Sequence, residues 1–193
     1  LGCFSFHPLK NLNVWGDGGI ITTNNSEYAS RLKLIRNHGL INRNTCVEFA
    51  YNSRLDTLQA VIARYLIRNK LNNITQERIK NSLLFDSFLK DIQEVNVNNR
   101  LKTLREVFHL YSFKADNRDG LYDFLRRNGV DAKIHYPIPM HLQPAANYLN
   151  YSQGDFPKAE YIANSTISLP VHEFIEESQI SYVSGLIKNF YSN

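Results

Sequence analysis

One lysine near the start of the chain stands where an amine could do chemistry. Lys10 belongs to the stretch CFSFHPLKN, in which an apolar and aromatic run of strand type stops at Pro8. A strand that stops in this way can hold the next side chains at the carboxyl edge of a sheet, where open α/β folds bind ligands. From these residues alone, Lys10 is either a reactive amine at that edge or an ordinary solvated loop residue.

A glycine cluster follows the same stretch, and it raises the question of a phosphate-binding loop. Gly16, Gly18 and Gly19 surround Asp17 in the run GDGG. A phosphate-binding loop leads from a strand into a helix, whereas this run leads into the β-branched residues IITT. We therefore interpret the cluster as a turn, in which glycine and aspartate supply unusual backbone angles.

The elements that must position these residues can be predicted from hydrophobic periodicity and turn signals. Strands are predicted at Cys3–Phe6, as a short buried strand, and at Ile20–Thr23, Val107–Lys114, Asp131–His135 and Ile167–Pro170. Helices are predicted at Glu27–Asn37, over Leu55–Leu89 with a bend or break near Asn72, and at Arg118–Asn128, Pro157–Asn164 and Glu176–Asn189. The opening strands cannot form a sheet with two covered faces, so we expect exposed apolar surface there and a chain that is the C-terminal portion of something larger.

Composition narrows the class of protein. The 193 residues, 43% of them hydrophobic and 21% charged, fit one large globular domain or two small ones. The net charge of +4 suits an anionic substrate, but the basic residues are scattered, which argues against a nucleic-acid partner. Cys3 and Cys46 form no metal-type cluster and indicate reduced thiols in a cytoplasmic protein. No apolar run reaches the roughly 18 residues of a membrane span, so no membrane partner is expected.

Several motifs in a fixed order carry a family resemblance. SFHPLKN and GDGGIITTN are followed by IRNHG, YNSRLDTLQAVIA, IHYPIPMHLQPA, GDFPKAE and SLPVH. This order resembles the C-terminal half of the DegT/DnrJ/EryC1/StrS family of nucleotide-sugar aminotransferases, which depend on pyridoxal 5'-phosphate. The resemblance implies an α/β fold: the end of an aspartate-aminotransferase-type (fold type I) large domain over residues 1–54, then a long linking helix and small C-terminal domain over 55–193.

The resemblance assigns Lys10 the central role. It is similar to the lysine that binds pyridoxal phosphate as a Schiff base and then moves a proton between the substrate and the cofactor. Dehydratase relatives carry histidine in its place, so Lys10 favours amino transfer. Neither His7 nor His141 is given a catalytic role.

Two further residues are implied to bind the cofactor phosphate. Ser5 resembles a serine whose hydroxyl donates to that phosphate; the alternative is a strand serine bonded to backbone. Asn52 resembles an asparagine that reaches the phosphate of the other subunit of a homodimer. The alternative for Asn52 is structural, because Asn52 or Ser53 could cap the helix that follows.

Three residues are implied to contact the sugar substrate. Arg54 resembles an arginine that meets acidic or phosphate groups, for which a guanidinium fork is suited. Its alternative is a salt bridge with Asp56 or a neighbour. His135 and Tyr136 resemble a sugar-contacting loop, and the alternative is a structural turn stiffened by the prolines.

The implied activity is transfer of an amino group from glutamate to a keto carbon of a nucleotide-diphosphate deoxysugar, for amino-sugar or surface-polysaccharide synthesis. The half of the family chain that holds the cofactor's pyridinium nitrogen is not in this sequence. A truncated, catalytically incomplete fragment, or a non-enzymatic regulatory or dimerising relative, is therefore the alternative.

Overall fold

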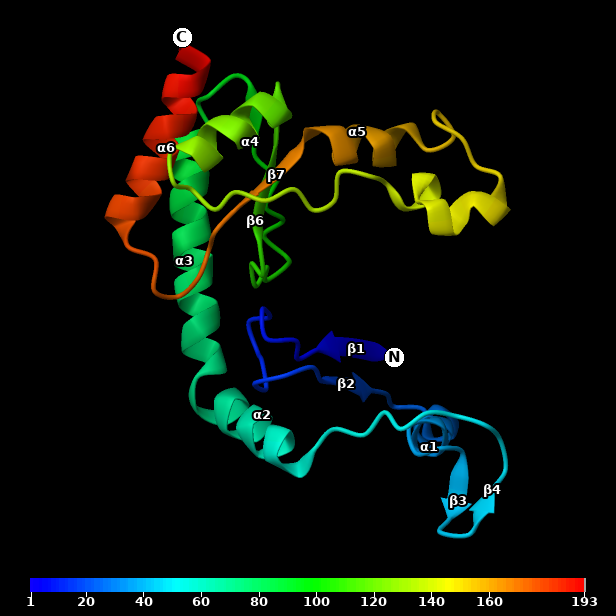
Figure 1. The fold of residues 1–193 in the computed structure, drawn as a ribbon. Coiled ribbons are helices and arrows are strands. Elements are labelled where there is room, and N and C mark those ends of the chain that lie inside the picture. Colours follow the sequence, from blue (N-terminus) through cyan, green and yellow to red (C-terminus); the bar gives the residue numbers. More distant parts are fainter. Residues whose placement is uncertain (193) are drawn as a thin grey trace. The chain divides into compact units, whose positions relative to one another are not determined.

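The computed structural model describes residues 1–192 and divides the chain into two compact units. The first unit is Leu1–Asn73, and the second begins at Ile74. Figure 1 follows the elements along the chain. This division does not test the predicted domain assignment, 1–54 and 55–193, which remains a prediction.

The first unit contains two small antiparallel ribbons and two helices. Strand β1 (Gly2–Ser5) pairs with β2 (Gly19–Thr22), and β3 (Leu40–Asn42) pairs with β4 (Thr45–Cys46). Helix α1 (Ser26–Ile35) begins after Asn25, whose side chain accepts the Tyr28 backbone N–H, and α2 (Thr57–Asn69) closes the unit. Gly39 at φ +69° is required here, since a Cβ would lie 1.8 Å from the Glu48 carbonyl oxygen.

The core of the first unit is small. Phe6, Val14 and Ala63 are its buried apolar residues, with Leu12 and Leu55 packed against them. Phe4 on β1 is 56% exposed, and Ile20 and Ile21 on β2 are 46% and 48% exposed. The predicted exposure is therefore confirmed, while the description of Cys3–Phe6 as a buried strand is wrong for all but Phe6, because a two-stranded ribbon cannot cover its own faces.

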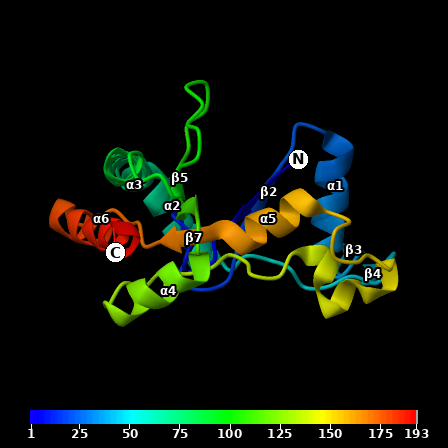
Figure 2. The ribbon, with the colours of Figure 1, turned by 90° about the horizontal axis from the view of Figure 1, so that it is seen from above.

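The second unit is built around a three-stranded antiparallel sheet in the order β5-β6-β7. The strands are β5 (Val95–Asn96), β6 (Tyr111–Ala115) and β7 (Thr166–Leu169). The helices are α3 (Leu71–Leu89), which begins in the first unit, α4 (Arg118–Arg127), α5 (Pro157–Ser165) and α6 (Glu177–Ser192), with short 3-10 helices η1 (Met140–Leu142) and η2 (Pro144–Leu149). In Figures 1 and 2, the segment with η1 and η2 extends away from the sheet of this unit and returns through α5 to β7.

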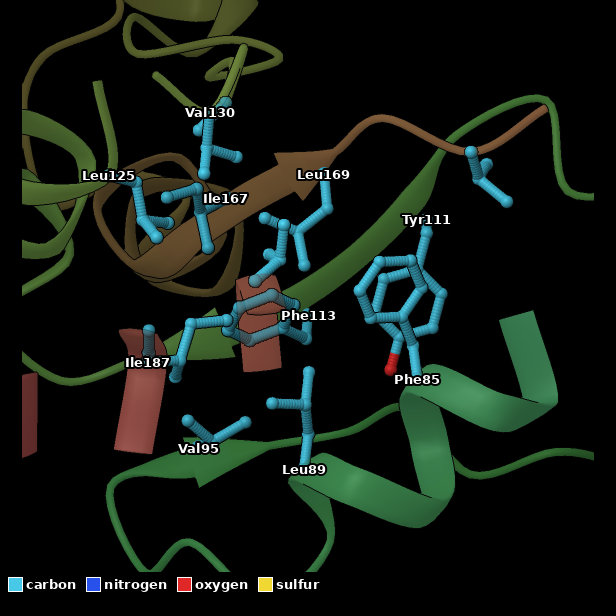
Figure 3. Close-up of a cluster of buried hydrophobic side chains, with 14 of the residues drawn as sticks. Phe85, Leu89, Val95, Tyr111, Phe113, Leu125, Val130, Ile167, Leu169 and Ile187 are labelled. Carbon is cyan, nitrogen blue, oxygen red and sulfur yellow. The ribbon is translucent and has the colours of Figure 1, made fainter. Parts of the chain in front are cut away.

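The core of the second unit lies between the sheet and α3, α4 and α6. Figure 3 shows Phe85 of α3 lying flat against Tyr111 of β6, with ring centroids 4.8 Å apart. Phe113, Ile167 and Ile187 are fully buried in the same cluster. The apolar stripe predicted for the last helix is confirmed: Ile180, Val183 and Ile187 are buried, and Leu186 and Phe190 pack against the cluster.

Most predicted elements are present, and the differences concern one helix break and several strands. The break predicted near Asn72 occurs at Lys70, between α2 and α3. The predicted strand Asp131–His135 is wrong, because only Lys133 pairs with the sheet before the chain turns off at the proline-rich loop. The β3–β4 ribbon and the two-residue β5 were not predicted, and β6 begins at Tyr111 rather than Val107.

Two negative findings apply to residues 1–192. No helix there combines the length and apolar character needed to cross a membrane. Cys3 and Cys46 are both free and exposed, so the expectation of unpaired thiols is confirmed.

Two phenylalanines on α3 test where stability resides. Phe85 is fully buried, whereas Phe88 on the same helix is 40% exposed. We expect Phe85→Ala to lower the free energy of unfolding by about 3–5 kcal/mol, because it empties a packed site. Phe88→Ala is the matched control and should cost less than about 1 kcal/mol. Urea unfolding followed by circular dichroism measures both, and equal losses would contradict this placement of the core.

Candidate active site

Lys10 lies in a loop that leaves the end of β1 and is closed by backbone hydrogen bonds. The Phe6 N–H donates to the Gly18 carbonyl at 2.8 Å, and the Val14 N–H donates to the Phe6 carbonyl at 3.3 Å. Because Phe6 and Val14 are both buried, they fix the two ends of the loop against the small core. The loop between them carries Lys10 at its centre, with its side chain half-buried.

Within this loop, hydrogen bonds connect Lys10 to Ser5. The His7 N–H donates to Ser5 Oγ at 3.2 Å, and the Lys10 N–H donates to the His7 carbonyl at 2.9 Å. The His7 ring accepts the Leu9 N–H at Nδ1 over 3.2 Å. His7 therefore organises the turn, and the turn sets the amine-bearing residue at a fixed offset from an exposed hydroxyl.

The donor set of this loop fits pyridoxal phosphate. The cofactor needs a primary amine for its aldehyde and several donors for its phosphate dianion. Lys10 supplies the amine. Ser5 Oγ accepts a hydrogen bond from His7, which leaves its own hydrogen to donate to a phosphate oxygen.

Asn52 and Arg54 lie in the segment before α2. Neither residue makes the structural contact that was the alternative to its binding role, a helix N-cap for Asn52 and a salt bridge with Asp56 for Arg54. Asp56 occupies the N-cap position of α2, without a side-chain capping hydrogen bond, so neither Asn52 nor Ser53 is the N-cap. Asn52 pairs with Asn37 as an isolated bridge, and its Oδ1 accepts the Arg54 N–H at 3.3 Å. The amide NH₂ of Asn52 is thus left to donate, as its predicted role requires.

Arg54 makes a different contact from the salt bridge that was the structural alternative to its predicted role. One of its terminal nitrogens, Nη1, donates to Asn37 Oδ1 at 2.5 Å, and no ion pair joins Arg54 to Asp56 among residues 1–192. The exposed guanidinium keeps its positive charge unpaired by a carboxylate, so it can attract an anionic group.

His135 and Tyr136 lie in the second unit, where the chain leaves the sheet. His135 Nδ1 lies 3.2 Å from Ser168 Oγ. The Tyr136 side chain is 73% exposed, and its ring meets the His135 ring edge-on with centroids 5.4 Å apart. The structure therefore brings these two residues together, one fixed to the sheet and the other open to solvent.

Tyr136 also lines an apolar cavity of about 720 Å³ in this unit. Ile138, Met140 and Phe156 are among its other lining residues. The loop that forms one wall is fastened by a partly buried pair, His141 Nε2 and Glu160 Oε1, 3.0 Å apart. Glu160 also accepts the backbone N–H groups of Gly154 and Phe156. His141 is therefore structural, as predicted, and Glu160 was not predicted because nothing in the local sequence marks its partner.

The comparisons with known proteins decide the family. A protein-family model described as the DegT/DnrJ/EryC1/StrS aminotransferase family matches residues 1–188. The chain belongs to this family. The pleiotropic regulatory protein of Geobacillus stearothermophilus is 37% identical over 97% of this chain and 51% of its own length. The dTDP-3-amino-3,4,6-trideoxy-alpha-D-glucose transaminase of Streptomyces venezuelae is 31% identical over 98% of this chain and 50% of its own length.

Solved structures agree on the fold. The S. venezuelae DesV structure, in complex with a ketimine intermediate, matches 99% of this chain with a TM-score of 0.93 and 31% identity. A family aminotransferase from Brucella abortus matches all of this chain with a TM-score of 0.89 and 33% identity. The predicted fold class is confirmed, and the chain spans about half the length of the relatives it matches.

The Glu160 carboxylate predicts an acid-sensitive contribution to stability. Hydrogen bonds, first from the Gly154 N–H and then from His141, lower the pKa of Glu160 below its ordinary value. A carboxyl whose pKa is lower in the folded state contributes stability above its unfolded pKa of about 4.3, and this is lost as pH falls through the folded pKa. We expect Glu160→Gln to lower stability at pH 7 and to shrink the loss on acidification. Unfolding at a series of pH values measures this, with Asp123→Asn, an exposed site, as the control.

Proposed function

We propose that this chain supplies the lysine-bearing and sugar-facing residues of a pyridoxal-phosphate-dependent aminotransferase. The enzyme would move an amino group from glutamate onto a keto carbon of a nucleotide-linked deoxysugar. The observation that carries the proposal is the ordered turn at the end of β1, in which hydrogen bonds through His7 link the Lys10 backbone to the Ser5 hydroxyl, in a chain of this family.

Each residue then has a defined task. Lys10 would hold the cofactor through its aldehyde carbon and, once displaced by the amino donor, carry a proton to and from the substrate α-carbon. Bound pyridoxal phosphate would supply the electron sink for that carbon. Ser5 and the Asn52 amide would donate to the phosphate, and Asn52 would do so across a homodimer. In the same proposal, 1–54 belongs to the cofactor domain and 55–193 to the linking helix and small domain.

The sugar-facing residues suit an anionic, oxygen-rich substrate. Arg54 would attract the diphosphate, since its charge is not paired with a carboxylate among residues 1–192. His135 and Tyr136 would contact the sugar. We favour a keto group at carbon 3, which is supported by relatives named as a 3-amino-sugar transaminase and as a 3-oxo-D-glucuronate aminotransferase. We also propose that the reaction takes place in the cytoplasm, where the enzyme would encounter such nucleotide-linked sugars.

A second candidate has a specific observation in its favour. Two relatives carry regulatory names, the pleiotropic regulatory protein of G. stearothermophilus and the sensory transduction protein EryC1 of Saccharopolyspora erythraea, the latter 34% identical over 96% of this chain. These names support a non-enzymatic regulatory or dimerising role as the alternative.

Covalent trapping of the cofactor distinguishes the aminotransferase from the non-enzymatic alternative. We expect borohydride reduction of the protein with pyridoxal phosphate to label Lys10, as found by peptide mass spectrometry. Label should disappear in Lys10→Ala and persist in the matched control Lys33→Ala, an exposed lysine on α1. No label on Lys10, or equal label on Lys33, would favour the non-enzymatic alternative.

Ser5 allows a graded test of the phosphate contact. Loss of a hydrogen bond to a charged group costs about 1.5–3 kcal/mol, so we expect Ser5→Ala to weaken pyridoxal-phosphate affinity at least roughly tenfold. Pyridoxal, which has no phosphate, should bind both proteins alike. Ser30→Ala on α1, where the hydroxyl donates to the Ser26 carbonyl, is the control. An equal loss for pyridoxal would show that Ser5 acts on the loop and not on the phosphate.

A further inference from the structure

The backbone donors of the turn that ends at Lys10 are all satisfied within the turn. Pro8 has no N–H, and the Lys10 N–H donates to the His7 carbonyl at 2.9 Å. The His7 N–H donates to Ser5 Oγ and the Leu9 N–H donates to His7 Nδ1, each over 3.2 Å. Residues 7–9 are exposed to solvent, so two side chains, those of Ser5 and His7, complete a turn that no core covers.

The contact with Leu9 fixes the state of the His7 ring. A backbone N–H can only donate, so Nδ1 must be an acceptor, and the proton of the neutral ring is on Nε2. A ring protonated on both nitrogens would direct a second N–H against the Leu9 N–H, donor against donor. The bond that completes the turn therefore exists only while the ring is neutral.

One carboxylate faces the other nitrogen of the ring. His7 Nε2 lies 3.9 Å from Asp17 Oδ1, and Asp17 is the acidic residue that pairs with this ring among residues 1–192. The Asp17 backbone is fixed, because its carbonyl accepts Gln59 Nε2 of α2 at 3.1 Å. A carboxylate attracts a protonated ring, whereas the Leu9 N–H selects the neutral one. The attraction is weak, since the Asp17 side chain is 92% exposed, and the other titratable group of the turn is Lys10 itself.

We propose that His7 is a positioning residue for Lys10 that acts only while its ring is neutral. In that state the turn is closed and holds the Lys10 backbone at the end of β1. Proton uptake at Nδ1 removes the bond from Leu9, and the turn that carries the amine loosens. Histidine ordinarily changes its charge within about pH 5–8, so this loosening belongs to that range. The closure of the turn stands on its geometry, whereas the consequence for the cofactor rests on the proposed function.

Asparagine at position 7 separates the two properties of the histidine. Its side-chain oxygen can accept the N–H two residues further on, as in an Asx turn, but it does not titrate. Leucine has no acceptor at all. The second unit offers a matched control, because His172 Nδ1 accepts the Phe174 N–H over the same 3.2 Å. His172→Leu removes an equivalent bond from the segment that follows β7.

The positioning of Lys10 is measured without cofactor, by ¹H–¹⁵N NMR of the full chain at about pH 7.5 and about pH 5. The readout is the order of the Lys10 backbone amide, given by its heteronuclear NOE. We expect this amide to be ordered only at the higher pH in the unsubstituted protein and in His172→Leu. It should be ordered at both pH values in His7→Asn and mobile at both in His7→Leu. Unchanged signals of the buried residues Phe6 and Val14 confirm that the first unit is folded.

Two results of this measurement would overturn the proposal. One is a Lys10 amide that stays ordered in His7→Leu. The other is a Lys10 amide that loosens at low pH in His7→Asn as it does with histidine. If His7→Leu lost the Phe6 and Val14 signals, the comparison of His7→Asn with the unsubstituted protein would still decide.

The consequence for the cofactor is tested by borohydride trapping of pyridoxal phosphate, with the label on Lys10 expressed relative to the label on Lys33. We expect His7→Leu to lower this ratio roughly fivefold, as for the loss of one hydrogen bond, and His7→Asn to retain it. An equal ratio in all three proteins would overturn the part of His7 in cofactor capture. No label on Lys10 in any of them would count against the proposed function, while the positioning of Lys10 is decided by the first measurement.

Discussion

The antiparallel register of β6 and β7 is the constraint on which the second unit depends. It places Tyr111 opposite Leu169 and Phe113 opposite Ile167, so the apolar side chains of both strands reach the same core. Side chains alternate between the faces of a strand, and a slip of one residue would exchange the buried and the polar sets. The same register places Ser112 opposite Ser168, so the core and the support of His135 are set by one pairing.

The first unit has no comparable constraint of its own. Its ribbon of β1 and β2 leaves Phe4, Ile20 and Ile21 substantially exposed, and its buried apolar cluster is small. What order there is around Lys10 comes from backbone hydrogen bonds that close the loop between Phe6 and Val14. A loop closed in this way can present an amine at a fixed position without a large core beneath it.

Polar contacts within each unit give its candidate residues their orientation. His7 shapes the turn before Lys10, Asn37 holds the Arg54 guanidinium, and Ser168 holds the His135 ring. Glu160 and His141 fasten the loop that follows Tyr136. In each case, residues that take no part in the proposed reaction hold a candidate residue, or the loop next to it, in place. Such supporting contacts give a site a defined geometry.

The sequence by itself determined the family, the fold class, the identity of Lys10 as the candidate amine, and the long helices. Each sequence motif and the periodicity of each helix are local patterns, so residues a few positions apart suffice to show them. Only the tertiary structure decided that Asp131–His135 is a single bridge rather than a strand, and that Asp56 rather than Asn52 caps α2. It also decided the pairs Arg54–Asn37, His141–Glu160 and Ser168–His135. These partners lie 17, 19 and 33 residues apart, and no local pattern specifies a contact that depends on how strands and loops meet in space.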